Sequence, residues 1–281
     1  MKVAAVQLHC SSVHSDNMAR AEFAIGSAVE QGAQLVVLPE LFASLDRTMA
    51  MRDAAEDLNG PTVTWARHSA STHQCTLIAG SIIERAGDQL FNTTVAVGPD
   101  GSILGTYRKI HLFDVDIDGA VSRESDTFTG GTEPIVITVP NSAMPSNDAN
   151  TESVRVGLTI CYDLRFPELF RAETVHGADI IVVPAAFTAA TGRDHWELLL
   201  RARAVENQLM VIAAAQWGTS PDGVDRHGHA LIIDAWGRVL ADAGAQGDTV
   251  IVADFDAQVQ ADIRKRLPAL THRRPENYDI N

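Results

Sequence analysis

The chain has few cysteines and no long apolar segment. Its 281 residues include only Cys10, Cys75 and Cys161, and an odd, sparse set of this kind does not form a disulfide framework. No apolar run reaches the roughly 18 residues that a membrane-spanning helix needs. The short apolar stretch that follows Lys2 is better interpreted as a strand than as the core of a signal peptide. We therefore expect a protein of the reducing cytoplasm that does not insert into a membrane.

Basic residues are also scarce. Lys and Arg number 22 against 36 Asp and Glu, which gives a formal net charge of −14. Non-specific binding to nucleic acid or to an anionic membrane needs a basic surface, so we expect neither partner. An anionic small substrate held by a few local arginines remains compatible with this charge.

The composition is that of a globular protein, with 46% hydrophobic and 21% charged residues. The chain is long enough for a large core, and no change in composition indicates a linker, so we predict a single domain over residues 1–281. The polar stretch from Asn141 to Ser153 is the best candidate for a surface loop.

Apolar runs alternate with helix-like stretches, which predicts an α/β fold with a mixed sheet. Several runs lack polar alternation, as expected for strands buried on both faces. Asp16 is a possible N-cap of the first helix and Gly32 its stop, while Pro61 suits a first helical position. The predicted strands are 2–8, 35–39, 76–84, 91–98, 103–108, 134–139, 154–161, 179–184, 210–216, 229–234, 238–242 and 248–255. The predicted helices are 16–31, one from 61, 167–176, 194–207 and 256–266.

A weak internal repeat is present. Residues 31–42 read QGAQLVVLPELF and residues 176–187 read HGADIIVVPAAF, with five of twelve positions identical. Any helix–glycine–strand unit has a similar pattern, so the repeat alone leaves two interpretations open. If it is real, the fold consists of two similar halves, which differ where Glu40 in the first copy is replaced by Ala185 in the second.

Cys161 stands at the end of an apolar run, in the segment VRVGLTICYDLRFPE. A nucleophile at a strand-to-helix turn is held exposed and rigid, and a helix N-terminus favours the thiolate. Buried cysteines are also common and mostly inert. The segment by itself therefore makes Cys161 a candidate nucleophile and no more.

Glu40 and Lys109 are the other two candidates. Glu40 follows the apolar run LVVLP, so we expect desolvation to raise its pKa toward that of a general base. Lys109 lies in YRKIHLFD between two strand-like segments and could stabilise an oxyanion. Taken singly, Glu40 is equally compatible with an ordinary glutamate at a strand end, and Lys109 is better explained as a solvated surface lysine.

The three segments together, in this order, resemble the nitrilase or carbon–nitrogen hydrolase superfamily over nearly the whole chain. The resemblance implies a four-layer α-β-β-α sandwich with two pseudo-symmetric halves and no metal or organic cofactor. It implies a catalytic triad of Glu40, Lys109 and Cys161, with Glu124 as a second glutamate that orients Lys109. It also implies at least a homodimer, with the C-terminal tail, about 267–281, at the interface.

The resemblance further implies a mechanism. Glu40 takes the proton of Cys161, the sulfur attacks an amide carbonyl, and Lys109 and the Tyr162 N–H hold the oxyanion. A thioester forms, ammonia leaves, and water activated by Glu40 completes the hydrolysis.

Two segments resemble the amidase branch that includes deaminated-glutathione amidase and ω-amidase. They are HWELLLRARAVENQLMVIAAAQ and LPALTHRRPENY. We expect a small carboxylated α-keto amide, with deaminated glutathione preferred over α-ketoglutaramate or α-ketosuccinamate. Arg165 is the candidate that binds the carboxylate, although it could instead pair with Asp163 or Glu168. Asp118, where relatives usually have proline, and the 141–153 loop leave the substrate preference open, and the same chemistry would serve a nitrilase or a carbamoylase.

Other interpretations are weaker. The segment DVDIDG (114–119) imitates the start of a calcium loop, but Ser125 stands where the bidentate glutamate belongs. His227 and His229 have no third ligand placed by spacing. A redox thiol protein is a weaker interpretation because no second cysteine stands near Cys161 in the sequence. A non-catalytic scaffold is also weaker, because a scaffold on this fold would need none of the three candidate residues.

Overall fold

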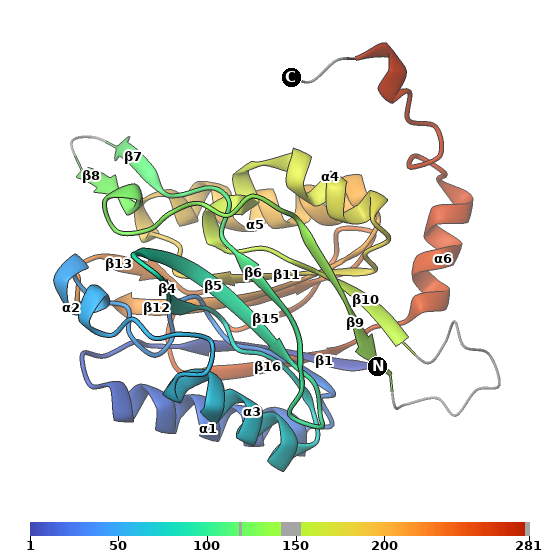
Figure 1. The fold of residues 1–281 in the computed structure, drawn as a ribbon. Coiled ribbons are helices and arrows are strands. Elements are labelled where there is room, and N and C mark those ends of the chain that lie inside the picture. Colours follow the sequence, from blue (N-terminus) through green and yellow to red (C-terminus); the bar gives the residue numbers. More distant parts are fainter. Residues whose placement is uncertain (118–119, 142–152, 279–281) are drawn as a thin grey trace.

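The computed structural model describes residues 1–117, 120–141 and 153–278. Its centre is one large, strongly curled sheet in which β1 and β12 lie side by side (Figure 1). From β4 the strand order runs β4-β5-β3-β2-β1-β12-β11-β10-β9, with β6 on β5, β16 on β1, and β13 and β14 on β12. The strands are β1 (Lys2–Leu8), β2 (Leu35–Val37), β3 (Thr76–Ile78), β4 (Ile82–Ala86), β5 (Gln89–Val97), β6 (Ile103–Arg108), β7 (Asp114–Ile117), β8 (Ala120–Arg123), β9 (Ile135–Pro140), β10 (Ser153–Leu158), β11 (Ile180–Ala185), β12 (Met210–Thr219), β13 (Asp225–His227), β14 (Leu231–Ile233), β15 (Val239–Asp242) and β16 (Thr249–Asp254).

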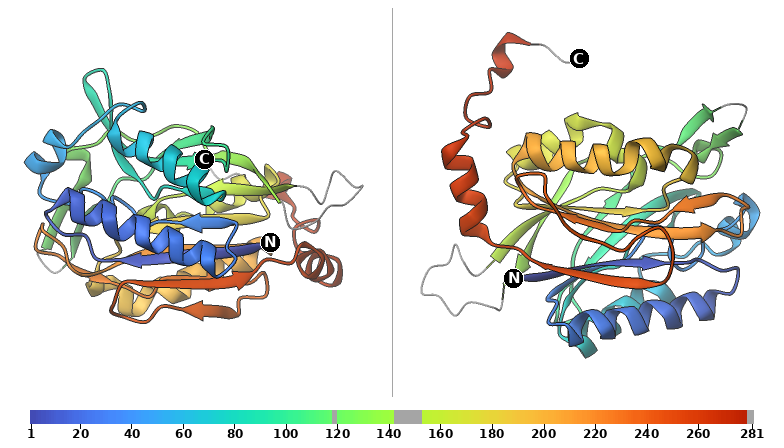
Figure 2. Two further views of the ribbon diagram at one scale, coloured as in Figure 1. Left: turned by 90° about the horizontal axis from the view of Figure 1, so that it is seen from below. Right: turned by 180° about the vertical axis from the view of Figure 1, so that it is seen from behind.

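Helices cover the two outer faces of this curled sheet, so the predicted α-β-β-α sandwich is confirmed (Figures 1 and 2). Helices α1 and α3 lie on one side, and α4 and α5 on the other. The sheet curls until its two ends face each other, with the Ile137 side chain of β9 against Gly105 of β6. The helices are α1 (His14–Glu30), α2 (Thr48–Asp53), α3 (Pro61–His73), α4 (Pro167–Val175), α5 (Ala189–Asn207) and α6 (Ala257–Arg266), with short 3₁₀ turns η1 (Glu124–Asp126), η2 (Cys161–Arg165) and η3 (Pro275–Asn277).

The continuous apolar runs of the sequence are explained by burial on both faces of the sheet. Along β1, Val3 and Ala5 pack into the cluster between the two halves, whereas Ala4 and Val6 pack beneath α1 and α3. All four side chains are fully buried. A strand without a solvent-facing side needs no polar alternation.

The internal repeat corresponds to a real structural repeat. In both copies a helix ends at a glycine with positive φ, +88° at Gly32 and +93° at Gly177, a conformation that favours glycine. The next residue donates its N–H to a carbonyl five residues back at 3.0 Å in each copy, Ala33 to Ala28 and Ala178 to Glu173. Strands β2 and β11 then enter the sheet parallel to their neighbours.

Several predicted boundaries are wrong. Helix α1 begins at His14 after the extended residue Val13, so Asp16 lies in its first turn and is not the N-cap. Helix α5 begins at Ala189 and not at 194. Its Gly192, which weakens a helix prediction, is required because the His227 ring lies directly against its Cα. The predicted strand 76–84 is two strands separated by Gly80, whose φ is +51°.

Helix α2, the β7–β8 hairpin and strand β13 were not predicted. Their sequences show little of the apolar periodicity on which the prediction of helices and strands depends. Most of the predicted 141–153 loop, residues 142–152, lies outside the described residues, as does Asp118.

The C-terminal segment leaves the sandwich after β16. Asp256 caps α6 by accepting hydrogen bonds from the Gln258 and Val259 N–H groups, and the chain beyond α6 runs away from the body (Figures 1 and 2). Its place at a subunit interface stays a prediction. In the part of the chain that the structure describes, no helix is both long and apolar enough to cross a membrane.

Glu173 of α4 gives the fold a pH dependence. Its side chain is fully buried against Gly157, and within the described residues neither carboxyl oxygen has a hydrogen-bond partner. Burial, reinforced by Asp163, raises the pKa of Glu173 well above its ordinary value. The folded protein therefore keeps a proton on Glu173 that the unfolded chain loses above about pH 4.3. The unfolding free energy consequently declines as the pH rises from that value to the raised pKa of Glu173 in the folded protein.

We predict that Glu173→Gln flattens this pH dependence. The variant should gain at least about 1 kcal/mol in unfolding free energy relative to wild type between pH 5 and pH 8, measured by chemical denaturation. Parallel pH curves for the two proteins would contradict the prediction.

Candidate active site

A cavity of about 440 Å³ opens at one edge of the sheet. Strands β2, β1, β12, β11 and β10 are mutually parallel, so their carboxyl ends meet at this edge, where α/β proteins commonly bind ligands. All four predicted catalytic residues line the cavity, as does the predicted oxyanion contributor, Tyr162. They are Glu40, Lys109, Glu124 and Cys161.

Glu40 follows β2 in a tight turn that other strands hold in place. Its backbone carbonyl accepts a hydrogen bond from Gln216 Nε2 at 2.6 Å. The next residue, Leu41, has a φ of +47° and donates its N–H to Ser81 Oγ at 3.0 Å. Gly80 packs its backbone against the Pro39 carbonyl, where a side chain would not fit. The carboxylate of Glu40 is thus fixed in a buried position.

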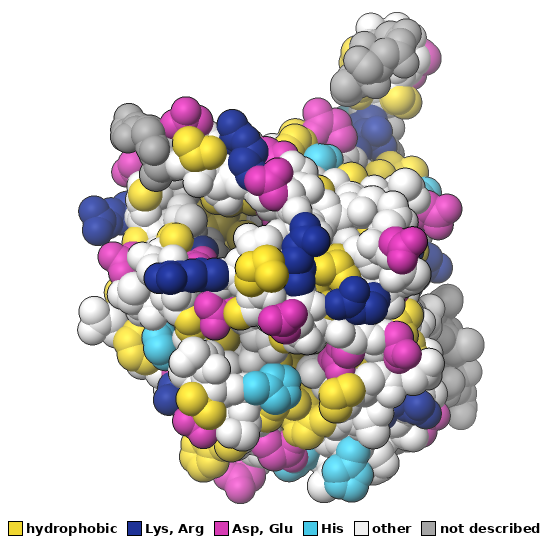
Figure 3. Space-filling view, turned by 60° about the vertical axis from the view of Figure 1, so that its left-hand side comes forward, with side chains coloured by type: hydrophobic (Ala, Val, Ile, Leu, Met, Phe, Trp, Pro, Cys, Tyr) yellow, Lys and Arg dark blue, Asp and Glu magenta, His cyan; other side chains and the backbone are white. Residues whose placement is uncertain are grey.

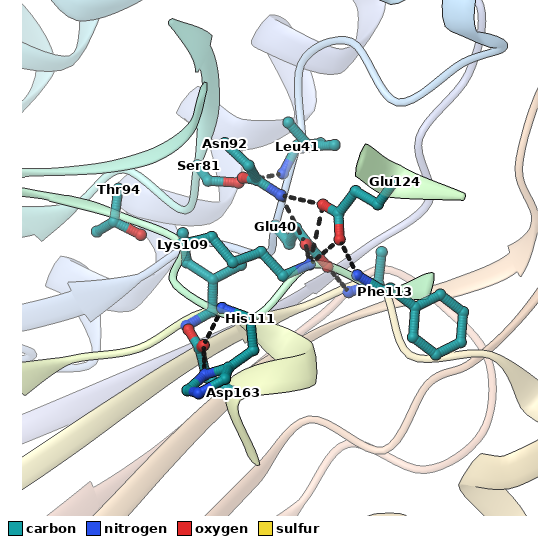
Figure 4. Close-up of polar contacts among 12 residues, drawn as sticks. Glu40, Leu41, Ser81, Asn92, Thr94, Lys109, His111, Phe113, Glu124 and Asp163 are labelled. Carbon is teal, nitrogen blue, oxygen red and sulfur yellow. Dashed lines mark hydrogen bonds and ion pairs between the residues drawn. The ribbon is translucent and has the colours of Figure 1, made fainter. Parts of the chain in front are cut away.

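Lys109 lies directly after β6 and places its ammonium between two carboxylates (Figure 4). Its Nζ is 2.9 Å from Glu40 Oε1 and 2.8 Å from Glu124 Oε2. Asn92 Nδ2, on β5, donates to both carboxylates, at 2.9 Å to Glu40 and 3.1 Å to Glu124. Burial opposes the charge of Lys109, but Glu124 and Glu40 together hold its pKa well above the ordinary value. The lysine is therefore a permanent cation in the cavity wall.

The expected rise in the pKa of Glu40 is wrong. Burial does act in that direction, but the Lys109 ammonium and hydrogen bonds from Lys109, the Cys161 thiol and the Ala186 N–H outweigh it and lower the pKa. The Ala186 N–H donates to Glu40 Oε2 at 2.9 Å. Glu40 is ionised at neutral pH because each oxygen has a donor.

Cys161 opens the 3₁₀ turn that follows β10, with a φ of +46°. It is buried, with 9% of its surface exposed, and the helix α4 begins only at Pro167. Burial and the adjacent Glu40 carboxylate raise the pKa of the Cys161 thiol well above its ordinary value, against the attraction of Lys109. The expectation of an exposed thiolate at a helix N-terminus is therefore corrected to a buried thiol beside a carboxylate.

Asp163 holds the turn that carries Cys161. Its fully buried carboxylate accepts four hydrogen bonds: from the Tyr107 hydroxyl at 2.8 Å, the Ile160 N–H at 2.9 Å, and the backbone N–H and Nδ1 of His111 at 3.1 and 2.7 Å. The His111 ring also stacks on Phe166, with centroids 3.6 Å apart. This network ties the cysteine turn to the segment directly after Lys109.

Arg165 is not among the residues that line the cavity. Its guanidinium packs 5.4 Å from the Phe187 ring centroid, and its Nη1 lies 3.3 Å from His195 Nδ1. No ion pair joins it to Asp163 or Glu168 within the described residues. The arginines that do line the cavity are Arg47, Arg123 and Arg226.

Sequence reasoning missed Asn92, Ala186 and Asp163 as parts of this site. Asn92 gave only a weak signal, because two further polar residues, Thr93 and Thr94, follow it in the β5 segment QLFNTTVAV. Ala186 acts only through its backbone N–H, which no residue type reveals. Asp163 was considered only as a partner for Arg165, although it lies in the segment around Cys161.

The competing metal sites have no support in the described chain. No group of three His, Cys, Asp or Glu side chains within the described ranges is placed to hold a metal ion. Asp114 Oδ1 accepts from the Ser125 N–H at 3.0 Å, and Glu124 faces Lys109. Asp118 and Gly119 lie outside the described residues. His229 Nδ1 pairs with Asp242 at 3.0 Å.

Comparisons with known proteins agree with this geometry. The profile of the carbon–nitrogen hydrolase family matches residues 2–265. The chain is 38% identical over 281 residues to omega-amidase NIT2 of Danio rerio, covering 100% of this chain and 97% of that protein. It is 39% identical over 274 residues to deaminated glutathione amidase of Synechocystis, covering 96% and 97%. The crystal structure of Saccharomyces cerevisiae Nit3, a member of branch 10 of the nitrilase superfamily, superposes with a TM-score of 0.82 at 31% identity, covering 95% of this chain and 94% of that chain.

The chain therefore belongs to the carbon–nitrogen hydrolase family, as its sequence motifs predicted. It is an enzyme of the class that hydrolyses carbon–nitrogen bonds.

Asp163→Asn should loosen the cysteine turn. The amide can accept only at its oxygen, so its NH₂ group would face two donors that now bind a carboxylate. We expect a loss of about 1–3 kcal/mol in unfolding free energy together with a lower kcat, measured by chemical denaturation and steady-state kinetics. The exposed Asp88→Asn is the matched control and should change neither. Unaltered stability of Asp163→Asn would show that the network does not hold the turn.

A second prediction concerns the resting state of the thiol. Because the pKa of Cys161 is raised, the difference in absorbance at 240 nm between wild type and Cys161→Ala should show no thiolate at pH 7. A thiolate signal that titrates with a midpoint below pH 7 would mean that Lys109 outweighs burial and Glu40.

Proposed function

We propose that this enzyme hydrolyses the amide bond of a small carboxylated α-keto amide through a thioester on Cys161. The observation that carries the proposal is the buried Lys109 ammonium held between Glu40 and Glu124, in the wall of the cavity that Cys161 also lines. A base, a cation and a nucleophile in one cavity are the parts that acyl transfer needs. A scaffold or a redox thiol protein gains nothing from burying an ion pair of this kind.

In the first half of the reaction, Glu40 takes the Cys161 proton as the sulfur attacks the amide carbon. The negative charge passes from the Glu40 carboxylate to the carbonyl oxygen, where Lys109 and the Tyr162 N–H stabilise it. The tetrahedral intermediate collapses, the C–N bond breaks, and Glu40 returns the proton to the leaving nitrogen. The product is a thioester on Cys161.

In the second half, water attacks the thioester while Glu40 takes its proton, and the acid and the Cys161 thiol are released. Lys109 again holds the oxyanion. Glu124 contacts both Lys109 and the Phe113 N–H, at 2.8 and 2.6 Å, so its role is to fix the position of the ammonium.

Two kinds of relative, an omega-amidase and a deaminated glutathione amidase, suggest different substrates for this enzyme. Their sequence identities to this chain, 38% and 39%, are too similar to favour one substrate over the other. Deaminated glutathione remains our first choice, with α-ketoglutaramate as the alternative. The expected release of ammonia needs refinement. It holds for the primary amide α-ketoglutaramate, whereas in deaminated glutathione the scissile nitrogen belongs to cysteinylglycine, so an amine leaves. Both substrates yield 2-oxoglutarate, and that product is therefore the one to follow.

The test is release of 2-oxoglutarate and of ammonia from deaminated glutathione and α-ketoglutaramate, with an aliphatic nitrile and an N-carbamoyl amino acid in parallel. Cys161→Ala should lose at least about 10⁴-fold in kcat. Cys75→Ala, which removes a buried thiol outside the cavity, should keep wild-type turnover. Preference for the nitrile or the carbamoyl compound would overturn the proposed class of substrate, and even a few per cent of the rate in Cys161→Ala would overturn the thioester.

A further inference from the structure

The cavity extends well beyond the reacting groups. Its wall continues from Cys161 and Lys109 past apolar side chains such as Phe113 and Phe128 to a mouth formed by the segment before α2 and by the end of β8. A volume of about 440 Å³ is within the range of pockets for drug-sized ligands. The residues at the mouth are therefore placed to contact a part of a substrate that does not react.

Two arginines stand at this mouth without a carboxylate partner. The Arg47 side chain forms no ion pair among the described residues, although its backbone N–H donates to Asp46, which also lines the cavity. Arg123 donates from Nη1 only to the neutral carbonyls of Val115 and Ser122, at 3.3 and 3.1 Å. The charge of Arg123 contributes to lowering the pKa of Asp114, but Asp114 Oδ1 accepts its hydrogen bond from the Ser125 N–H and not from Arg123. Both arginines are exposed residues, and neither guanidinium donates to a carboxylate among the described residues.

The third arginine of the cavity differs from these two. Arg226 is nearly buried, forms an ion pair with Asp222, and donates to Ser220 Oγ at 2.9 Å and to the Ala186 carbonyl at 3.0 Å. Its donors are engaged in holding the segment that contacts Glu40. It therefore supports the site and leaves Arg47 and Arg123 as the cations open to a ligand.

The two open arginines are brought together by the fold. Arg47 directly precedes α2, and Arg123 directly precedes η1. Arg52 of α2 donates from Nη2 to the Asp126 carbonyl of η1 at 2.6 Å, which ties the two segments. Arg123 is also the neighbour in sequence of Glu124, whose carboxylate contacts Lys109. The pair is thus anchored to the reacting groups.

We propose that Arg47 and Arg123 form a carboxylate-binding subsite, which selects amides that carry a carboxylate away from the scissile bond. Guanidinium groups bind carboxylates through paired, charge-assisted hydrogen bonds. On a chain with a net charge of −14, two unpaired arginines at the mouth of a cavity also attract an anion that the rest of the surface repels. This inference rests on the proposed function and assigns the recognition role to these two residues in place of Arg165. Figure 3 shows the side of the molecule that carries α2 and the β7–β8 hairpin, with Lys and Arg side chains around a hollow.

The first experiment measures binding without turnover. In the Cys161→Ala background, the Kd of 2-oxoglutarate is measured by calorimetry with and without Arg47→Gln and Arg123→Gln. We expect each substitution to weaken binding about tenfold and the pair about 30-fold or more. Arg238→Gln, an exposed arginine outside the cavity, should leave the Kd unchanged. Weaker binding in Arg165→Gln, with no change in the other two, would overturn the subsite.

The second experiment measures turnover in the presence of Cys161. The substrates are α-ketoglutaramate and its carboxyl methyl ester, which keeps the scissile amide and removes the charge. For the charged amide, KM should rise about tenfold in each arginine variant with kcat within about twofold, while the ester is processed as by wild type. Equal KM changes for both substrates would overturn the subsite. Absence of turnover with intact binding would contradict the proposed function and leave the subsite standing.

Discussion

The site is organised by the Lys109 ammonium, which is buried and shared between Glu40 and Glu124. A buried lysine ammonium is costly unless its charge is compensated, and here two carboxylates and a shared Asn92 donor complete the arrangement. The same cation lowers the pKa of Glu40 and opposes, without overcoming, the rise in that of Cys161. This ion therefore keeps the base charged, whereas burial and Glu40 keep the nucleophile protonated, and all three groups line the same cavity.

The sheet delivers these groups to one place. Because the strands on either side of β1 and β12 are parallel, the segments after β2, β10 and β11 leave the sheet at the same edge. The turns that carry the functional groups are constrained, with positive φ at both Leu41 and Cys161. Each turn is held by residues outside it: the first by Ser81 and Gln216, and the second by Tyr107 and His111, which bind Asp163 within that turn. Such positions persist only where the surrounding structure fixes them.

Apolar runs are local signals, and they predicted most strands and a mixed α/β fold. The layers and the set of residues gathered in the cavity were predicted only through the resemblance that the ordered motifs carry. The pKa directions at Glu40 and Cys161 were mispredicted, since a pattern indicates burial but not the charges that burial brings into contact. The start of α5 was missed for a similar reason: Gly192 weakens a helix locally and is needed for the approach of His227. Arg165 was chosen for its nearness in sequence to Cys161, whereas Arg47 and Arg123 reach the cavity from distant segments.

The two copies of the internal repeat meet at the site. Glu40 follows the strand of the first copy, and the Ala186 N–H that contacts it follows the strand of the second. A chain of half this length, paired with its own copy, would bring two such glutamates to the axis that relates the halves, where their like charges would repel. A single strand-end glutamate facing a backbone N–H is possible only once the halves differ. The joining of two halves in one chain thus permits an asymmetric active site within a nearly symmetric framework.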